Sequence, residues 1–82
     1  MATIAAQVSL YPLRRTHMGR PVTDAVEVFR RAGLEVQMGA MSTTLVGEAH
    51  ALFSALEEAF TAACESGSTI LVVTVSNACP VS

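Results

Sequence analysis

The spacing of hydrophobic residues changes from one segment of this chain to the next, and the order of the changes limits the possible folds. Residues 4–11 alternate apolar and mixed positions, which predicts a strand. From Pro21 to Gly33 apolar residues recur at helical spacing, with Pro and Gly at the positions where helices begin and end. Further strands are predicted at residues 34–38, 41–47 and 69–76, and a second helix at residues 48–66.

The order strand–helix–strand–strand–helix–strand is that of a ferredoxin-like α+β fold. We therefore expect residues 1–82 to form a single domain, with a four-stranded antiparallel sheet and both helices on one face. The other face would carry Gln7, Ser9, Tyr11 and either Ser42 or Thr43. Because the last strand is apolar throughout, we expect this face to pack against a second subunit.

The composition narrows the class of protein. Apolar residues make up 51% of the chain and charged residues 15%, which excludes a disordered chain and favours self-association. The net charge of −2 argues against general binding to nucleic acid or to an anionic membrane. No apolar run reaches the length of a transmembrane helix, and the arginines follow the first apolar run, unlike those of a signal peptide. We expect a cytoplasmic protein.

The two cysteines are too few for a disulfide scaffold, and no spacing of cysteine or histidine predicts a metal site or a cofactor. Cys64 is expected on the side of its helix that faces the core. Cys79 would act as a nucleophile only with a base and a third, orienting group, and neither His17 nor His50 has such a partner in the sequence. An enzyme is therefore the least favoured interpretation.

Polar residues gather near the ends of the predicted strands, in the segments that begin at Ser9, Met41 and Ser76. Together with their surroundings, VSLYPL, MSTTLVGE, HALFSALEEAF and VTVSNACP occur in the same order as in the YkoF-type thiamine-binding family. The chain resembles that family from about Gln7 to Pro80. The family's unit occurs once, in chains that oligomerise, or twice in tandem, and this chain carries it once.

The resemblance implies a non-catalytic protein that binds thiamine (vitamin B1) or its hydroxymethylpyrimidine moiety, in vitamin transport or salvage. It also implies a homodimer or homotetramer. The candidate ligand-binding residues are Ser9, Tyr11, Met41, Ser42, Thr43, Glu48, Ser76, Asn77 and Cys79. Hydroxyl and amide groups among them suit the pyrimidine, whereas Tyr11 would stack on the ligand and Glu48, expected close to the hydroxyls, would face the cationic thiazolium.

Each candidate also has a purely structural interpretation. Glu48 suits the start of a helix, Ser42 and Thr43 suit a strand, and Asn77 suits a turn. Tyr11 could cover the core or a subunit interface. The alternative function is a regulatory or structural protein-interaction module that uses the exposed sheet face and binds no metabolite.

Overall fold

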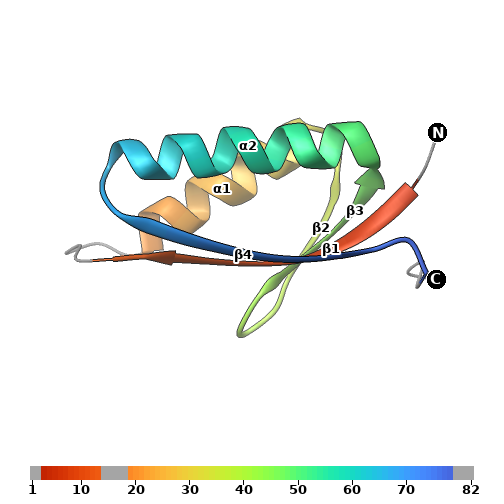
Figure 1. Ribbon diagram of the computed structural model, residues 1–82, viewed down its shortest axis with the longest axis horizontal. Coiled ribbons are helices and arrows are strands. Elements are labelled where there is room, and N and C mark those ends of the chain that lie inside the picture. The colour runs from red at the N-terminus through yellow and green to blue at the C-terminus, as the bar shows by residue number, and fades with distance from the viewer. Residues whose placement is uncertain (1–2, 14–18, 79–82) are drawn as a thin grey trace.

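The elements of the structure follow the predicted order. A computed structural model describes residues 3–13 and 19–78. Its elements are β1 (Thr3–Pro12), α1 (Gly19–Arg31), β2 (Glu35–Met38), β3 (Thr43–Glu48), α2 (Ala49–Glu65) and β4 (Thr69–Ser76). The strands form one antiparallel sheet in the order β2-β3-β1-β4, and both helices cover the same face (Figure 1). The predicted ferredoxin-like α+β fold is confirmed.

The core lies between the sheet and the two helices. Because side chains alternate between the two faces of β1, every second residue of this strand contributes to the core. Ile4, Ala6 and Val8 point to the helices and are buried. Leu45 of β3 and Leu52 of α2 are completely buried. Removing a leucine side chain from such a position costs about 2–5 kcal/mol of unfolding free energy, so these two residues of one core cluster do much to hold β3 and α2 together.

The end of α1 is fixed by a glycine. Gly33 has a φ of 83°, and its N–H donates to the Arg30 carbonyl at 3.0 Å. The N–H of Leu34 donates to the Phe29 carbonyl at 3.2 Å. This pair of bonds is a Schellman motif, whose left-handed position favours glycine. The predicted helix stop is confirmed, although α1 begins at Gly19, two residues before Pro21.

Two local predictions are wrong. The third strand begins at Thr43 rather than Met41, because the Gly39 N–H donates to the Ser42 carbonyl at 2.8 Å and closes the β2–β3 turn before the strand starts. Cys64 is exposed, since the neighbouring Ala63 occupies the buried position of that helical turn.

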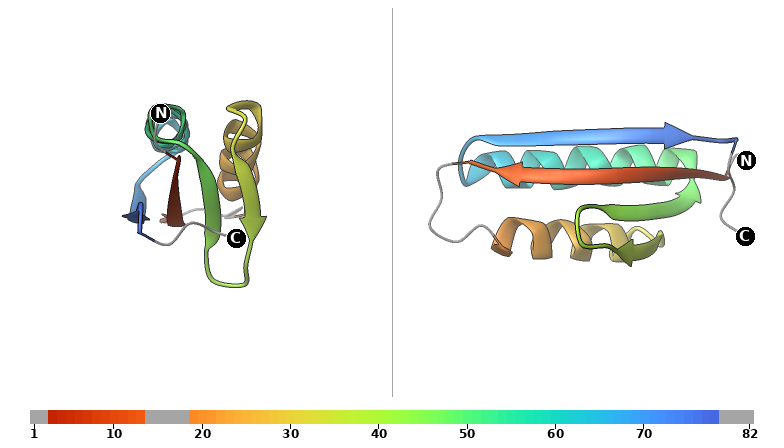
Figure 2. Two further views of the ribbon diagram at one scale, coloured as in Figure 1. Left: turned by 90° about the vertical axis from the view of Figure 1, so that its right-hand side faces the viewer. Right: turned by 90° about the horizontal axis from the view of Figure 1, so that it is seen from below.

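One face of the sheet is left uncovered by the helices, as the two perpendicular views show (Figure 2). We call this the open face. Tyr11, Ile70 and Val72 lie on it with 48%, 47% and 51% of their surfaces exposed. Tyr11 faces Ile70 across the β1–β4 pairing, so the apolar residues are adjacent. Thr43 is not on this face but points toward the helices and is buried. Packing of the open face against a second subunit stays a prediction.

Candidate functional site

The sheet opens on one side of β1 because β1 continues beyond its partner β3. Pairing between β1 and β3 ends where Val8 faces Thr43, whereas pairing between β1 and β4 continues to Pro12 and Thr69. The cause is the β2–β3 turn at residues 39–42, which leads the chain away from β1. The last part of β1 therefore has a strand on one side only.

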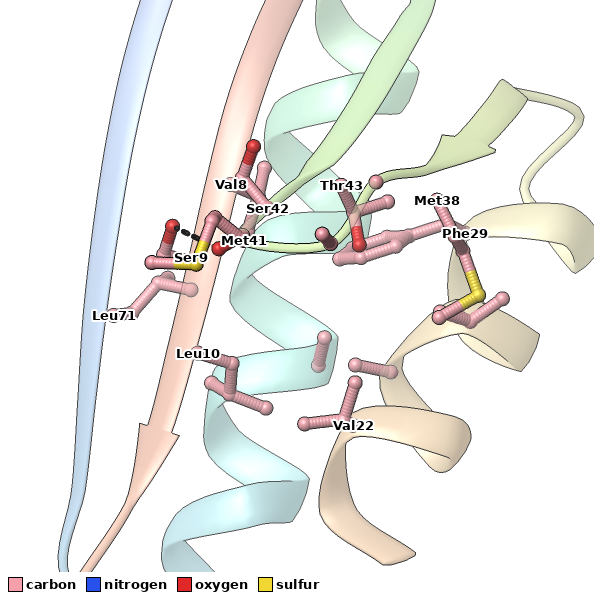
Figure 3. A pocket seen from close by; sticks show the side chains of 15 residues that line it. Val8, Ser9, Leu10, Val22, Phe29, Met38, Met41, Ser42, Thr43 and Leu71 are labelled. Carbon is pink, nitrogen blue, oxygen red and sulfur yellow. Dashed lines mark hydrogen bonds between the residues drawn. The ribbon is translucent and has the colours of Figure 1, made fainter. Parts of the chain in front are cut away.

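A cavity of about 200 Å³ borders this unpaired stretch (Figure 3). Its walls come from β1, β2, β3, the β2–β3 turn, α1, α2 and β4. Most of the lining is apolar: Val8, Leu10, Val22, Ala25, Val26, Phe29, Met38, Met41, Ala59 and Leu71. No charged side chain lines the cavity within the part of the chain that the structure describes. Such a site suits a neutral, flat and largely apolar group.

Thr43 supplies a polar group inside this cavity. It is only 9% exposed, and its hydroxyl points into the cavity toward the ring of Phe29 (Figure 3). Among the described residues, the hydroxyl has no hydrogen-bond partner. A buried hydroxyl without a partner destabilises the folded state, so this group is available to a ligand or a water molecule.

Two side chains of β1 hold the β2–β3 turn in place. The Ser9 hydroxyl donates to the Met41 carbonyl at 3.5 Å, and the Gln7 side-chain amide donates to the Ser42 hydroxyl at 3.2 Å. The turn carries Met41, which is 86% exposed, to the rim of the cavity. Because methionine is flexible, it can adapt to ligands of different shape there.

The structure thus brings four of the predicted site residues together: Ser9, Met41, Ser42 and Thr43 line one cavity. Tyr11 lies two residues beyond Ser9, on the open face rather than in the cavity.

The expectation that Glu48 lies close to these hydroxyls is wrong. Glu48 is at the other end of β3, facing Thr3, and an extended strand separates it from Thr43 by about 17 Å. Its carboxylate caps α2, accepting a hydrogen bond from the Ala51 N–H at 3.0 Å. That bond, with a second from the His50 N–H, lowers the pKa of Glu48. The interpretation of Glu48 as a helix-start residue is confirmed.

The remaining candidates lie near that same end of the sheet or outside the described residues. Ser76 faces Ala5 across the β1–β4 pairing, and its hydroxyl accepts a hydrogen bond from the Ala78 N–H at 3.0 Å. Asn77 follows it and is exposed. Cys79 lies outside the described residues.

Sequence reasoning missed the apolar half of the site. Val22 and Phe29 belong to the helical stripe of α1, which the sequence pattern predicts without indicating a ligand site there. Leu10 lies at one of the apolar positions in the alternation of residues 4–11, which predicts a strand and no binding role. The signal that could have found them is the Gly39-Ala40 break, which ends β2 and separates the hairpin from β1.

The described part of the chain shows neither a metal centre nor a membrane span. Within residues 3–13 and 19–78, no cluster of three histidine, cysteine or acidic side chains is placed to hold a metal ion. No helix among the described residues has the length and apolar character needed to cross a membrane.

Solved structures confirm the fold. A hypothetical protein from Methanocaldococcus jannascii is 27% identical, with a TM-score of 0.86 over 93% of this chain and 80% of that one. A domain of unknown function (DUF77) from Bacillus cereus is 26% identical, with a TM-score of 0.81 over 99% and 83%. A Thermotoga maritima protein described as a thiamine biosynthesis/salvage protein shares the fold at 15% identity, with a TM-score of 0.79 over 89% and 81%.

Comparison of the sequence with curated proteins gives no match. Comparison with protein families does: residues 6–77 match the family described as thiamine-binding protein. The matched segment contains nearly all of the described fold and every residue that lines the cavity. The chain therefore belongs to the thiamine-binding protein family.

Proposed function

We propose that this protein binds thiamine or its hydroxymethylpyrimidine moiety reversibly, without chemical change, and serves vitamin transport or salvage. The pyrimidine ring occupies the cavity beside β1. The observation that carries the proposal is an apolar cavity containing one unpartnered buried hydroxyl, that of Thr43. Family membership supports the identity of the ligand.

The size and charge of the cavity favour the pyrimidine half of thiamine. An apolar cavity of about 150 Å³ is large enough for benzene, so about 200 Å³ suits one substituted six-membered ring. The thiazolium is cationic, and no carboxylate lines the cavity among the described residues. In this proposal the thiazolium extends past Met41 toward solvent or a second subunit, and Ser9 and Ser42 line the rim.

A homodimer or homotetramer is part of the same proposal. The apolar residues of the open face give a second subunit a place to pack. Tyr11, on that face, is the candidate for stacking on the exposed part of the ligand. Glu48, Ser76 and Asn77 join the site only if a second subunit brings that end of the sheet near a cavity. A cytoplasmic location is part of the same proposal.

Calorimetric titration and thermal melting with hydroxymethylpyrimidine, thiamine and the thiamine phosphates test the function. A ligand that binds only the native state stabilises it by about 2.7 kcal/mol at a hundredfold excess over its Kd. For a domain of this size, each kcal/mol raises the melting midpoint by roughly 4–8 °C. We expect the Kd for hydroxymethylpyrimidine to lie within about tenfold of the Kd for thiamine. No shift with any of them at millimolar concentration overturns the proposal.

A matched pair of variants locates the site. Val22→Phe fills the cavity, whereas Val72→Phe makes the same change on the open face. We expect Val22→Phe to abolish pyrimidine binding and Val72→Phe to retain it. The reverse result would place the ligand on the open face.

The second candidate is a protein-interaction module that uses the open face, and the exposed Tyr11, Ile70 and Val72 favour it. It requires that no pyrimidine raise the melting midpoint. The same titration therefore separates the two functions.

A further inference from the structure

The direction of the backbone groups of β1 follows from one hydrogen bond beyond its end. The Leu13 N–H donates to the Ser68 carbonyl at 2.9 Å, which extends the β1–β4 ladder by one bond. N–H and C=O groups of an extended strand alternate between its two sides. The odd-numbered residues of β1 therefore direct these groups to β4, and the even-numbered residues direct them to β3.

The β2–β3 turn gives the same result independently. The bond from the Gly39 N–H to the Ser42 carbonyl means that even-numbered residues of β3 direct their groups to β2. Thr43 therefore directs its N–H and C=O to β1, where it faces Val8. The pair Val8–Thr43 is the last hydrogen-bonded pair of this ladder.

Leu10 is the next residue whose backbone points to that side. In the register of the ladder it would face Met41, but Met41 lies in the turn, outside β3. No hydrogen bond joins the Leu10 N–H or C=O to another described residue. Pro12, the following residue on this side, has no N–H. Of the described residues of β1 beyond the ladder, Leu10 alone presents both a donor and an acceptor here.

Leu10 also lines the cavity, whose walls include the unpartnered hydroxyl of Thr43 (Figure 3). Its N–H and C=O form the closely spaced donor–acceptor pair that one residue offers to a neighbouring strand. In an apolar surrounding such groups favour a partner strongly, because unpaired backbone groups are costly away from water.

We propose that the peptide backbone of Leu10 recognises the edge of an aromatic ring that carries an amine next to a ring nitrogen. The Leu10 carbonyl accepts from the amine, and the Leu10 N–H donates to the ring nitrogen. A side-chain amide pairs in a similar donor–acceptor way with the amine and N7 of adenine, on another edge of that base. This inference rests on the proposed function and adds the specificity element: the ligand class is 4-aminopyrimidines and rings of the same donor–acceptor pattern.

Three probes test the pattern in the full-length protein. They are 4-amino-5-hydroxymethyl-2-methylpyrimidine, its analogue with methyl in place of the amine, and its analogue with C–H in place of the ring nitrogen at position 3. We expect each analogue to bind at least about tenfold more weakly, since each loses one hydrogen bond and leaves one backbone group unpaired. Equal affinity for all three overturns the inference.

Amide NMR of ¹⁵N-labelled protein reports on the residue itself. Titration with the aminopyrimidine should shift the Leu10 amide downfield and slow its hydrogen exchange at least tenfold. The Val8 amide, already bonded in the ladder, is the control and should change little. Binding that leaves the Leu10 amide unchanged overturns this inference alone, whereas no binding of any probe overturns the proposed function with it.

An amide-to-ester change at residue 10, introduced by chemical ligation, removes the N–H and keeps the side chain. The matched control is the same change at Val73, whose N–H points to the outer edge of β4 by the same alternation. We expect the ester at Leu10 to weaken aminopyrimidine binding about tenfold and the ester at Val73 to leave it unchanged. Equal effects at the two positions overturn the inference.

Discussion

Thr43 faces Val8 in the last pair of the β1–β3 ladder. Among the described residues it is the most buried of those that carry a hydroxyl, and it also lines the cavity. Stability and binding therefore make opposite demands on this residue. A hydroxyl buried without a partner destabilises the free protein, whereas the same group can pair with a ligand.

Replacing Thr43 by Val should separate the two demands, because valine has nearly the same shape and lacks the hydroxyl. We expect the free protein to gain about 1 kcal/mol of unfolding free energy, or roughly 4–8 °C in melting midpoint. Affinity for hydroxymethylpyrimidine should fall by about tenfold. Urea unfolding and calorimetry measure the two effects.

Thr61→Val is the control, because Thr61 is exposed on α2 and does not line the cavity. It should change neither quantity appreciably. If Thr43→Val lowers stability and leaves affinity intact, the hydroxyl is a structural group and the cavity assignment is wrong.

The sequence was sufficient for the fold because each helix and strand has its own characteristic spacing of hydrophobic residues. In addition, Gly33 ends α1 by a backbone angle that glycine favours. The sequence was insufficient for the site because the site depends on where β3 starts and on which end of that strand each polar residue lies. Thr43 and Glu48 share one motif, yet an extended strand places them at opposite ends of β3. The cavity exists because β3 begins two residues later than the pattern predicts. The Gly39-Ala40 break marks the end of β2 but not the residue at which β3 starts.

The cap of α2 should make stability depend on pH. Hydrogen bonds from the Ala51 and His50 N–H groups lower the pKa of Glu48 in the folded protein from its ordinary value of 4.5. As the pH falls, the Glu48 carboxylate is protonated in the unfolded chain before it is protonated in the folded protein. Its contribution to the unfolding free energy is therefore complete above pH 4.5 and is lost as the pH falls through the lowered folded-state pKa. Unfolding free energy measured by urea titration between pH 7 and 3 should decline accordingly.

Glu48→Gln should remove this part of the decline, because glutamine does not titrate. Glu57→Gln, on the exposed side of α2, is the matched control. The Glu48→Gln variant should keep its affinity for hydroxymethylpyrimidine if the cavity of one subunit is the whole pyrimidine site. An unchanged pH dependence would show that the cap contributes nothing measurable.

Gly47 and Leu34 are in direct contact between β3 and the segment after α1. A Cβ on Gly47 would lie 2.5 Å from Leu34 Cδ2, and Leu34 is buried, so its side chain has little room to move. We expect Gly47→Ala to cost about 1–3 kcal/mol of unfolding free energy through overpacking. Chemical denaturation measures the loss.

A double-mutant cycle identifies the cause of that loss. Leu34→Ala removes the clashing methyl groups, so Gly47→Ala should cost at least about 1 kcal/mol less in the Leu34→Ala background than alone, by the coupling of about 0.5–3 kcal/mol found for residues in contact. Additive effects would mean that Gly47 is needed for a different reason.

The open face should control assembly. Tyr11 and Ile70 are neighbours across β1 and β4, and each exposes nearly half of its surface. If a second subunit covers them, light scattering will give two or four times the chain mass of 8.6 kDa for the unaltered protein. Ile70→Lys places a charge in that interface, and because burying an unpaired charge is costly, the mass should fall to 8.6 kDa.

Phe53→Lys makes an equivalent change at an exposed position of α2, on the helical side, and should leave the assembly intact. A single-chain mass for the unaltered protein would exclude the assembly, and dissociation by Phe53→Lys alone would move the interface to the helices.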